Sequence, residues 1–154
     1  RKGETLLLAL APQAIIIRTA WLYSAHGNNF VKTMLRLADS QPEIKVVCDQ
    51  IGTPTFARDL ARAVVKVLQS HQWVPGIYHF TDEGAASWYD FAKAIFRIAG
   101  KDVKVTPIPT EDYPTPASRP SYSILDRTRI KATYGIEIPH WEEALADCLR
   151  QLGY

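Results

Sequence analysis

Short β-branched and apolar runs alternate with stretches of helical periodicity along the chain. Four runs predict strands, at residues 14–17, 44–48, 77–80 and 103–108. The first run is apolar throughout, which is typical of a strand buried on both faces of a parallel sheet. A further short segment, 122–126, could be extended. Between 107 and 120, five prolines crowd the chain and predict a stiff, irregular loop, because proline fixes φ and lacks an N–H donor.

Apolar residues recur at helical spacing between these runs. Asn28 or Asn29 can cap one helix, and Ser87 with Asp90 forms a capping-box pattern at another, which Gly100 is placed to end. Residues 1–10 are typical of the interior of a helix. The predicted apolar faces are Phe30, Met34, Leu37 and Ala38; Leu60, Val64, Val67 and Leu68; Trp88, Phe91, Ala92, Ile95 and Ala99; and Trp141, Leu145, Cys148, Leu149 and Leu152.

Alternating strands and helices favour an α/β protein with parallel strand pairing. The composition agrees: 47% apolar and 22% charged residues in 154 positions exclude whole-chain disorder and suit one domain. A net charge of +2 argues against a nucleic acid or an anionic membrane as partner. No apolar run is long enough to span a membrane and no signal peptide is recognised, so a cytoplasmic protein with free thiols at Cys48 and Cys148 is expected.

Generic catalytic motifs are missing from the sequence. It has no glycine-rich phosphate loop and no Gly-x-Ser-x-Gly elbow, and its four histidines show no metal-ligand spacing. His79 falls in a predicted strand and is expected to be packed or hydrogen-bonded rather than catalytic. These patterns alone lead no further than an α/β domain.

Four longer strings are more specific. They are RTAWLY at 18–23 followed by GNNF at 27–30; DQIGTPT at 49–55; GIYHF at 76–80 followed by Gly84 and SWYDFA at 87–92; and YPTPASRP at 113–120 followed by SILD at 123–126. In this order they resemble the C-terminal half of the dTDP-4-dehydrorhamnose reductase family, which belongs to the extended short-chain dehydrogenases/reductases. The resemblance runs from Gly3 to about Leu152. It implies the last parallel Rossmann strands and a small α/β substrate-binding domain.

The resemblance also implies a reaction. The family uses NADPH or NADH to reduce the C4 ketone of dTDP-4-dehydro-L-rhamnose, with a Tyr-x-x-x-Lys pair and a glycine-rich nucleotide turn. Neither feature is present here, and the family's lysine would fall one position before Arg1. Tyr89 and Lys93 have that spacing, but they are expected to be a pair on a helix surface. We therefore expect residues 1–154 to be a substrate-binding region that lacks the dinucleotide-binding domain, contains no catalytic residue and is inactive alone.

The resemblance assigns ligand contacts to six positions. Trp21 matches a sugar-stacking aromatic, Asn28 and Asn29 match a substrate-loop pair, and Arg119 matches an arginine suited to a diphosphate. Thr19 and Ala20 match the segment that passes the nicotinamide. Simpler interpretations stay open: a core tryptophan, a helix cap and a surface arginine. The loop with Gln50, Gly52, Pro54 and Thr55 matches a lining of the same cleft, where packing and binding cannot be separated.

Partners and metals follow from the same comparison. Some relatives bind a divalent metal through carboxylates at a dimer contact near the helix starting at Arg58 and Asp59, but the cationic Arg58 predicts no metal here. The expected ligand is a dTDP-sugar, with a homodimer or a partner that supplies a nucleotide-binding domain. Alternatives are a non-catalytic module, such as a regulatory subunit of methionine adenosyltransferase, and a folded or dimerising remnant without a ligand.

Overall fold

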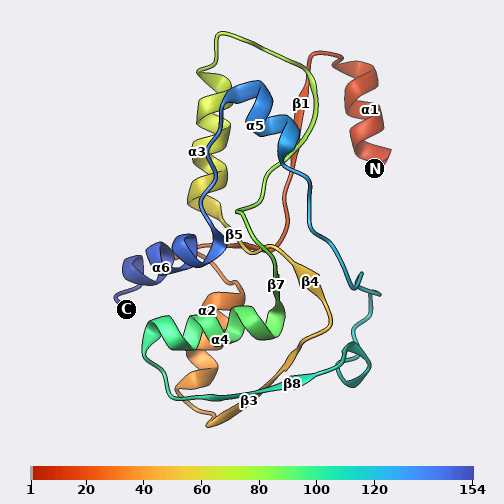
Figure 1. Cartoon of the computed structure of the whole chain (residues 1–154). Coiled ribbons are helices and arrows are strands. Elements are labelled where there is room, and N and C mark those ends of the chain that lie inside the picture. Colours follow the sequence, from red (N-terminus) through yellow and green to blue (C-terminus); the bar gives the residue numbers. More distant parts are fainter. Residues whose placement is uncertain (1) are drawn as a thin grey trace.

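The chain folds around two separate clusters of buried apolar side chains, which define two lobes (Figure 1). The computed structural model describes residues 2–154. The first lobe contains α1 (Lys2–Leu10), β1 (Ile15–Arg18), α3 (Ala57–Leu68), β6 (Gly76–His79) and α5 (Thr128–Tyr134). The second contains α2 (Phe30–Ala38), β3 (Glu43–Val47), α4 (Trp88–Ala99), β8 (Lys104–Ile108) and α6 (Trp141–Gln151). The chain passes repeatedly from one lobe to the other, so each lobe is assembled from distant segments.

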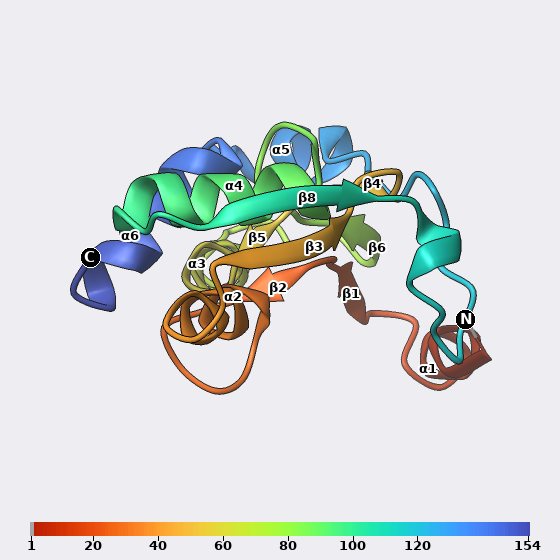
Figure 2. The same ribbon diagram turned by 90° about the horizontal axis from the view of Figure 1, so that it is seen from below.

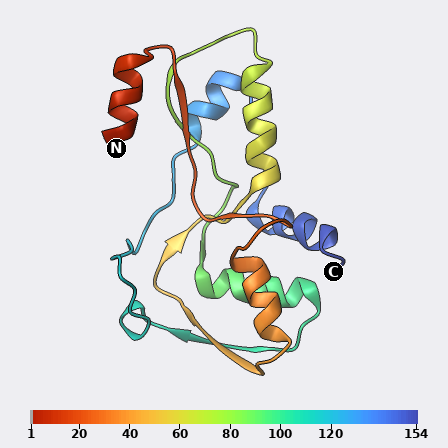
Figure 3. The same ribbon diagram turned by 180° about the vertical axis from the view of Figure 1, so that it is seen from behind.

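A parallel strand pair forms the centre of the first lobe. β1 pairs with β6 so that Ile15 lies opposite Gly76 and Arg18 opposite His79. Helices α3 and α5 contribute buried side chains around β6, and Figure 3 shows α1 standing apart from α3, with β1 between them. The core of this lobe consists of Ala63, Val67, Tyr78, Phe80, Ile130, Tyr134 and Ile136.

The second lobe packs three helices against another parallel pair. Strands β3 and β8 run side by side in Figure 2, with Glu43 opposite Lys104 and Val47 opposite Ile108. Helices α2, α4 and α6 supply most of the core, and Phe91, Ile95, Leu145 and Leu149 are almost completely buried. This larger core supports the face on which the candidate site lies.

Short strands connect the lobes. β2 (Leu22–Tyr23) pairs in parallel with β5 (Thr55–Phe56), and β4 (Ile51–Gly52) pairs antiparallel with β7 (Ala86–Ser87). A 3-10 turn, η1 (Thr110–Asp112), follows β8. These strands lie where β1 and β6 end, and the carboxyl ends of parallel strands are where α/β folds place their ligands.

The structure confirms the predicted α/β fold with parallel strands. It also confirms the predicted helix ends. Asn29 caps α2 by accepting a hydrogen bond from Lys32 N, Ser87 and Asp90 form the capping box of α4, and Gly100 ends α4 with φ 64°. These ends were predictable because each depends on a side chain a few residues away.

Four features differ from the sequence-based prediction. Helix α5 was not predicted, and α3 buries Ala63 and Val67 but leaves Val64 and Leu68 exposed. The isoleucines of β1 are only half-buried, and among the described residues β1 pairs with β6 alone. In segment 122–126, for which an extended conformation was considered, Tyr122 forms an isolated β-bridge with Ile51. In the described chain, no helix has the length and apolar character needed to cross a membrane.

Candidate functional site

A pocket of about 420 Å³ opens between α2, β3 and the proline-rich loop that follows β8. The buried lining side chains of α2 and β3 are apolar and form its floor: Met34, Ile44, Val46 and Val47. The exposed lining side chains form its rim: Gln41, Lys45, Tyr113, Thr115 and Arg119. The lining residues are Phe30, Thr33, Met34, Leu37, Gln41, Ile44, Lys45, Val46, Val47, Gln50, Trp88, Tyr113, Thr115 and Arg119. An apolar cavity with a few polar groups at its mouth suits a small organic ligand with one charged end.

Among the described residues that line the pocket, the one arginine comes from the proline-rich loop. Arg119 is exposed on the loop, and Tyr113, whose side chain is 59% exposed, precedes it on the same rim. Tyr113 was part of a motif string but was not selected as a site residue. The structure places it at the pocket with Arg119, so a planar ring and a guanidinium lie on one rim.

Trp21 contacts the pocket wall indirectly, through the indole of Trp88. Its ring stacks on Trp88 with centroids 3.6 Å apart and an interplanar angle of 11°. Trp88 lines the pocket and Trp21 does not. Gly52 lies so close to Trp21 that a β-carbon there would approach the indole Cε2 to 2.5 Å. Trp88 was predicted only as part of a buried helix face, and no sequence signal paired it with Trp21.

The two asparagines lie at the start of α2 but outside the pocket lining. Asn29 is committed to local structure: Oδ1 accepts from Lys32 N at 3.2 Å, and Nδ2 donates to Ser24 O at 2.7 Å. Asn28 is exposed. The next residue, Phe30, does line the pocket, so this turn lies beside it.

Thr19 and Ala20 follow β1 directly, with Thr19 exposed and Ala20 half-buried. They lie at the carboxyl end of the strand, away from the pocket lining. Arg18 just before them donates to both carboxylate oxygens of Glu4, at 2.8 and 2.6 Å, and approaches His79 Nε2 at 3.5 Å. Nδ1 of His79 also lies 3.2 Å from Asp126 O, so this histidine is hydrogen-bonded, as predicted.

Comparison with known proteins decides the family. All residues from 1 to 154 match the family model described as the RmlD substrate binding domain. The chain belongs to this family. It is 47% identical to a dTDP-4-dehydrorhamnose reductase of Aggregatibacter actinomycetemcomitans, over 94% of this chain and 52% of that protein. It is 44% identical to the spore coat polysaccharide biosynthesis protein SpsK of Bacillus subtilis, over 98% of this chain and 52% of that protein.

Solved structures agree with this RmlD family membership. A dTDP-4-dehydrorhamnose reductase from Clostridium acetobutylicum superimposes with a TM-score of 0.94 at 48% identity, over 99% of this chain and 54% of that one. The enzyme from Bacillus anthracis, in complex with NADP, gives a TM-score of 0.90 at 41% identity, over 97% of this chain and 52% of that one. The chain spans about half the length of the relatives that it matches.

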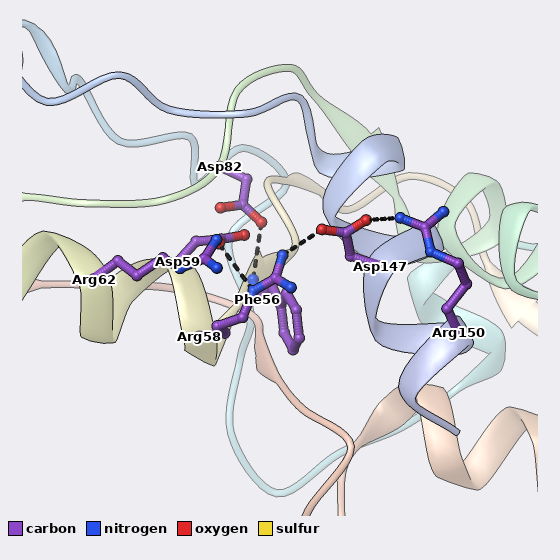
Figure 4. A network of polar contacts seen from close by, with 7 residues as sticks. All are labelled: Phe56, Arg58, Asp59, Arg62, Asp82, Asp147 and Arg150. Atoms are coloured by element: carbon purple, nitrogen blue, oxygen red, sulfur yellow. Dashed lines mark hydrogen bonds and ion pairs between the residues drawn. The ribbon is translucent and has the colours of Figure 1, made fainter. Parts of the chain in front are cut away.

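A polar network joins the two lobes of this RmlD domain (Figure 4). Arg58 donates to Asp147 at 2.5 Å and to Asp59 at 3.4 Å, and its guanidinium lies 4.6 Å from the centre of the Phe56 ring. The Arg58 guanidinium holds the pKa of Asp147 below its usual value. Within residues 2–154, no three His, Cys, Asp or Glu side chains gather into a metal-ligating group. In this network between the lobes, the guanidinium of Arg58 is the positive charge that lies beside Asp59 and Asp147.

Asp82 is the most deeply buried acid of the network. Its side chain is completely buried and accepts a hydrogen bond from Phe56 N at 2.8 Å. Desolvation raises the pKa of Asp82 to about 7, and the neighbouring Asp59 adds to the rise. Asp82 Oδ1 and Asp59 Oδ2 are both buried without a hydrogen-bond partner in the described structure. Sequence reasoning did not select either acid as a site residue, because their proximity depends on how α3 packs beside the chain that follows β6.

Tyr89 and Lys93 are neighbours on α4. The ammonium of Lys93 lies 5.5 Å from the centre of the Tyr89 ring, one helical turn away. The structure thus confirms that this Tyr-x-x-x-Lys spacing is a helix-surface pair.

Proposed function

We propose that this chain is the substrate-binding region of a dTDP-4-dehydrorhamnose reductase and that its pocket binds a dTDP-sugar. The observation that carries the proposal is the pocket itself, which combines an apolar floor with Arg119 at the rim. A guanidinium offers paired donors that match phosphate oxygens, while an apolar floor suits a pyrimidine base or a deoxysugar. Membership of the RmlD family supports the same ligand class.

The paired indoles are the proposed platform for the sugar. Trp88 lines the pocket, and Trp21 stacks on it and extends the aromatic surface. Tryptophan provides an apolar face together with an N–H donor, a combination that suits a deoxysugar. Asn28 and Asn29 precede the pocket-lining Phe30 at the N-terminus of α2, where partial positive charge favours an anionic group. Asn28 is the more exposed of the two residues.

For the cofactor, we propose that Thr19 and Ala20 pass the nicotinamide of NADPH or NADH at the end of β1. The relative from Bacillus anthracis was solved with NADP. The sequence contains no glycine-rich turn of the dinucleotide-binding type. Residues 1–154 therefore require a dinucleotide-binding domain, supplied by another segment or by a partner, and are expected not to oxidise NADPH alone.

Calorimetric titration of the full chain with dTDP tests the proposal. The wild-type chain is expected to bind, and Arg119→Ala is expected to bind about 10- to 100-fold more weakly, since charge-assisted hydrogen bonds contribute about 1.5–3 kcal/mol. Arg36→Ala is the matched control, because Arg36 is exposed on α2 but does not line the pocket. A folded wild-type chain that does not bind dTDP, or an Arg119→Ala variant that binds equally well, would overturn the proposal.

A further inference from the structure

The proline-rich loop is held at both ends by the same short segment of chain. At its start, Thr110 N donates to Asp49 Oδ2 at 3.0 Å, and the Thr110 hydroxyl donates to Asp49 Oδ1 at 2.6 Å. At its end, Ile51 N donates to Ser121 O at 2.8 Å, and Ser123 N donates to Ile51 O at 2.9 Å. Residues 49–51 therefore set where the loop leaves the second lobe and where it returns.

Thr110 is the centre of the first attachment. Besides donating to Asp49, its hydroxyl oxygen accepts a hydrogen bond from Gln50 Nε2 at 3.1 Å. A hydroxyl has one proton to donate and two lone pairs, so both contacts form at once. The hydrogen bonds from Thr110 keep the pKa of Asp49 below its usual value, and this carboxylate stays ionised at neutral pH.

Gln50 connects this attachment to the pocket. Its side chain is only 7% exposed, it lines the pocket, and its amide is the group that holds Thr110. The loop between the attachments is exposed from residue 111 to 120. The Thr115 hydroxyl donates to Ala117 O at 2.8 Å, a hydrogen bond that stays within the loop. The position of Arg119 over the pocket thus depends on the two ends of the loop and on its prolines.

We propose that Thr110, clamped by Asp49 and Gln50, is a positioning residue that holds Arg119 over the pocket for the ligand's phosphate groups. This inference rests on the proposed function, in which Arg119 contacts the ligand. Thr110 would keep Arg119 ordered for that contact. Without the clamp, the loop has to be ordered when the ligand binds, and each side chain ordered on binding costs about 0.5–1.5 kcal/mol. Thr110 itself does not touch the ligand.

The test combines two variants of Thr110 with Arg119→Ala in dTDP titrations of the full chain. Thr110→Val keeps the shape and removes the hydroxyl, and it is expected to weaken binding roughly three- to tenfold. Thr110→Ser restores the hydroxyl and is expected to bind within about twofold of wild type. The double variant Thr110→Val/Arg119→Ala is expected to bind no more weakly than Arg119→Ala alone, because both changes remove the same interaction.

Thr106→Val is the matched control. Thr106 also precedes the loop and also donates its hydroxyl to a carboxylate, Glu43 Oε1, at 2.5 Å, but it lies outside the pocket lining. It is expected to leave dTDP affinity unchanged. Unchanged affinity in Thr110→Val, or losses that multiply in the double variant, would overturn the proposal, since a merely structural role predicts independent effects.

A ligand-free measurement separates this inference from the proposed function. The ¹H–¹⁵N heteronuclear NOE of the Thr115, Ser118 and Arg119 amides is expected to fall in Thr110→Val and to stay at the wild-type value in Thr110→Ser and Thr106→Val. A lower NOE in a chain that does not bind dTDP would refute the proposed function and leave the clamp standing. An unchanged NOE in Thr110→Val would refute the clamp whatever the ligand is.

Discussion

The indole of Trp21 stacks on that of Trp88 at 3.6 Å although the two residues come from different segments of the chain. Trp21 has φ 48°, in the left-handed region that residues other than glycine rarely adopt. This conformation costs about 1–2 kcal/mol. The backbone at Trp21 is therefore held by its surroundings, and the ring contact with Trp88 and the close approach of Gly52 are the contacts that accompany it.

Gly52→Ala is expected to displace the Trp21 indole. The added methyl would lie 2.5 Å from Cε2, which no unperturbed packing tolerates, and such overpacking costs about 1–3 kcal/mol. Near-ultraviolet circular dichroism should show a weaker signal from the stacked indoles, and urea unfolding should show the loss of stability. Gly3→Ala is the control, because nothing lies within 4 Å of a β-carbon at Gly3. Equal stability of Gly52→Ala and wild type would contradict the described packing.

Asp82→Asn is expected to change how stability depends on pH. The pKa of Asp82 is raised in the folded protein from 3.8 to about 7, so between these values the folded state holds a proton that the unfolded state releases. The contribution of Asp82 to the stability of the folded protein therefore falls as the pH rises from about 4 to about 7. The Asp82→Asn variant lacks this pH dependence. It should be more stable than the wild-type protein at pH 8 by on the order of 2–4 kcal/mol.

Urea titrations at several pH values measure the effect of Asp82→Asn. Asp126→Asn is the comparison, because its pKa is lowered by hydrogen bonds from Thr128 and its contribution is lost only as the pH falls below the usual carboxyl range. It should leave the slope between pH 4 and 7 intact. Parallel curves for Asp82→Asn and wild type would show that Asp82 does not titrate in this window.

Arg58→Ala is expected to destabilise the contact between the lobes by about 1–3 kcal/mol, since it removes the ion pair with Asp147, leaves Asp59 without this partner and uncovers Phe56. Arg97→Ala is the matched control, because it also removes one ion pair. Arg97 pairs with Glu142 at 2.6 Å on the surface, where such pairs contribute about 0–1 kcal/mol. Thermal unfolding of both variants gives the comparison, and similar losses would mean that the Arg58 network adds nothing beyond a surface pair.

Arg18→Gln is expected to loosen α1. None of the side chains of this helix is buried, and the bidentate contact between Arg18 and Glu4 joins it to β1. Hydrogen–deuterium exchange should quicken in residues 5–10 while α4 keeps its protection. The control variant Arg150→Gln breaks a surface contact with Asp147 and should leave α1 unaffected. Slow exchange of α1 in Arg18→Gln would show that other contacts hold the helix.

Local patterns predicted most of the secondary structure because their causes are local. The caps at Asn29 and Ser87 depend on residues within a turn, and the apolar strand runs are visible directly. Helix α5 was missed because only Ile130 and Tyr134 of its seven residues are buried, too few for a periodic pattern. Val64 and Leu68 were assigned to the wrong face of α3, since an exposed apolar residue looks the same in sequence as a buried one.

The candidate site was only partly predictable for a different reason. The resemblance pointed to Arg119, which lines the pocket, and to Trp21, which stacks on its wall. It also named Gln50, which lines the pocket, but it gave no reason to pair Trp21 with Trp88 or Gln50 with Thr110. Both pairings join segments far apart along the chain, and the contact between Gln50 and Thr110 forms only once β3 and β8 have paired. The ligand roles of Trp21, Asn28, Asn29, Arg119, Thr19 and Ala20 stay predictions.

The two parallel strand pairs have a consequence for the order in which the chain can fold. Arg18 lies opposite His79, 61 residues later, and β3 pairs with β8 across a similar stretch. Closing such long loops costs entropy before any ladder hydrogen bond forms, so folding on a timescale of about milliseconds to seconds is expected. Within residues 2–154, β1 and β3 have no partner strand until β6 and β8 have been synthesised. Until β6 is available, the apolar Ile15–Ile17 run has no strand partner within residues 2–154 and is exposed to misassociation.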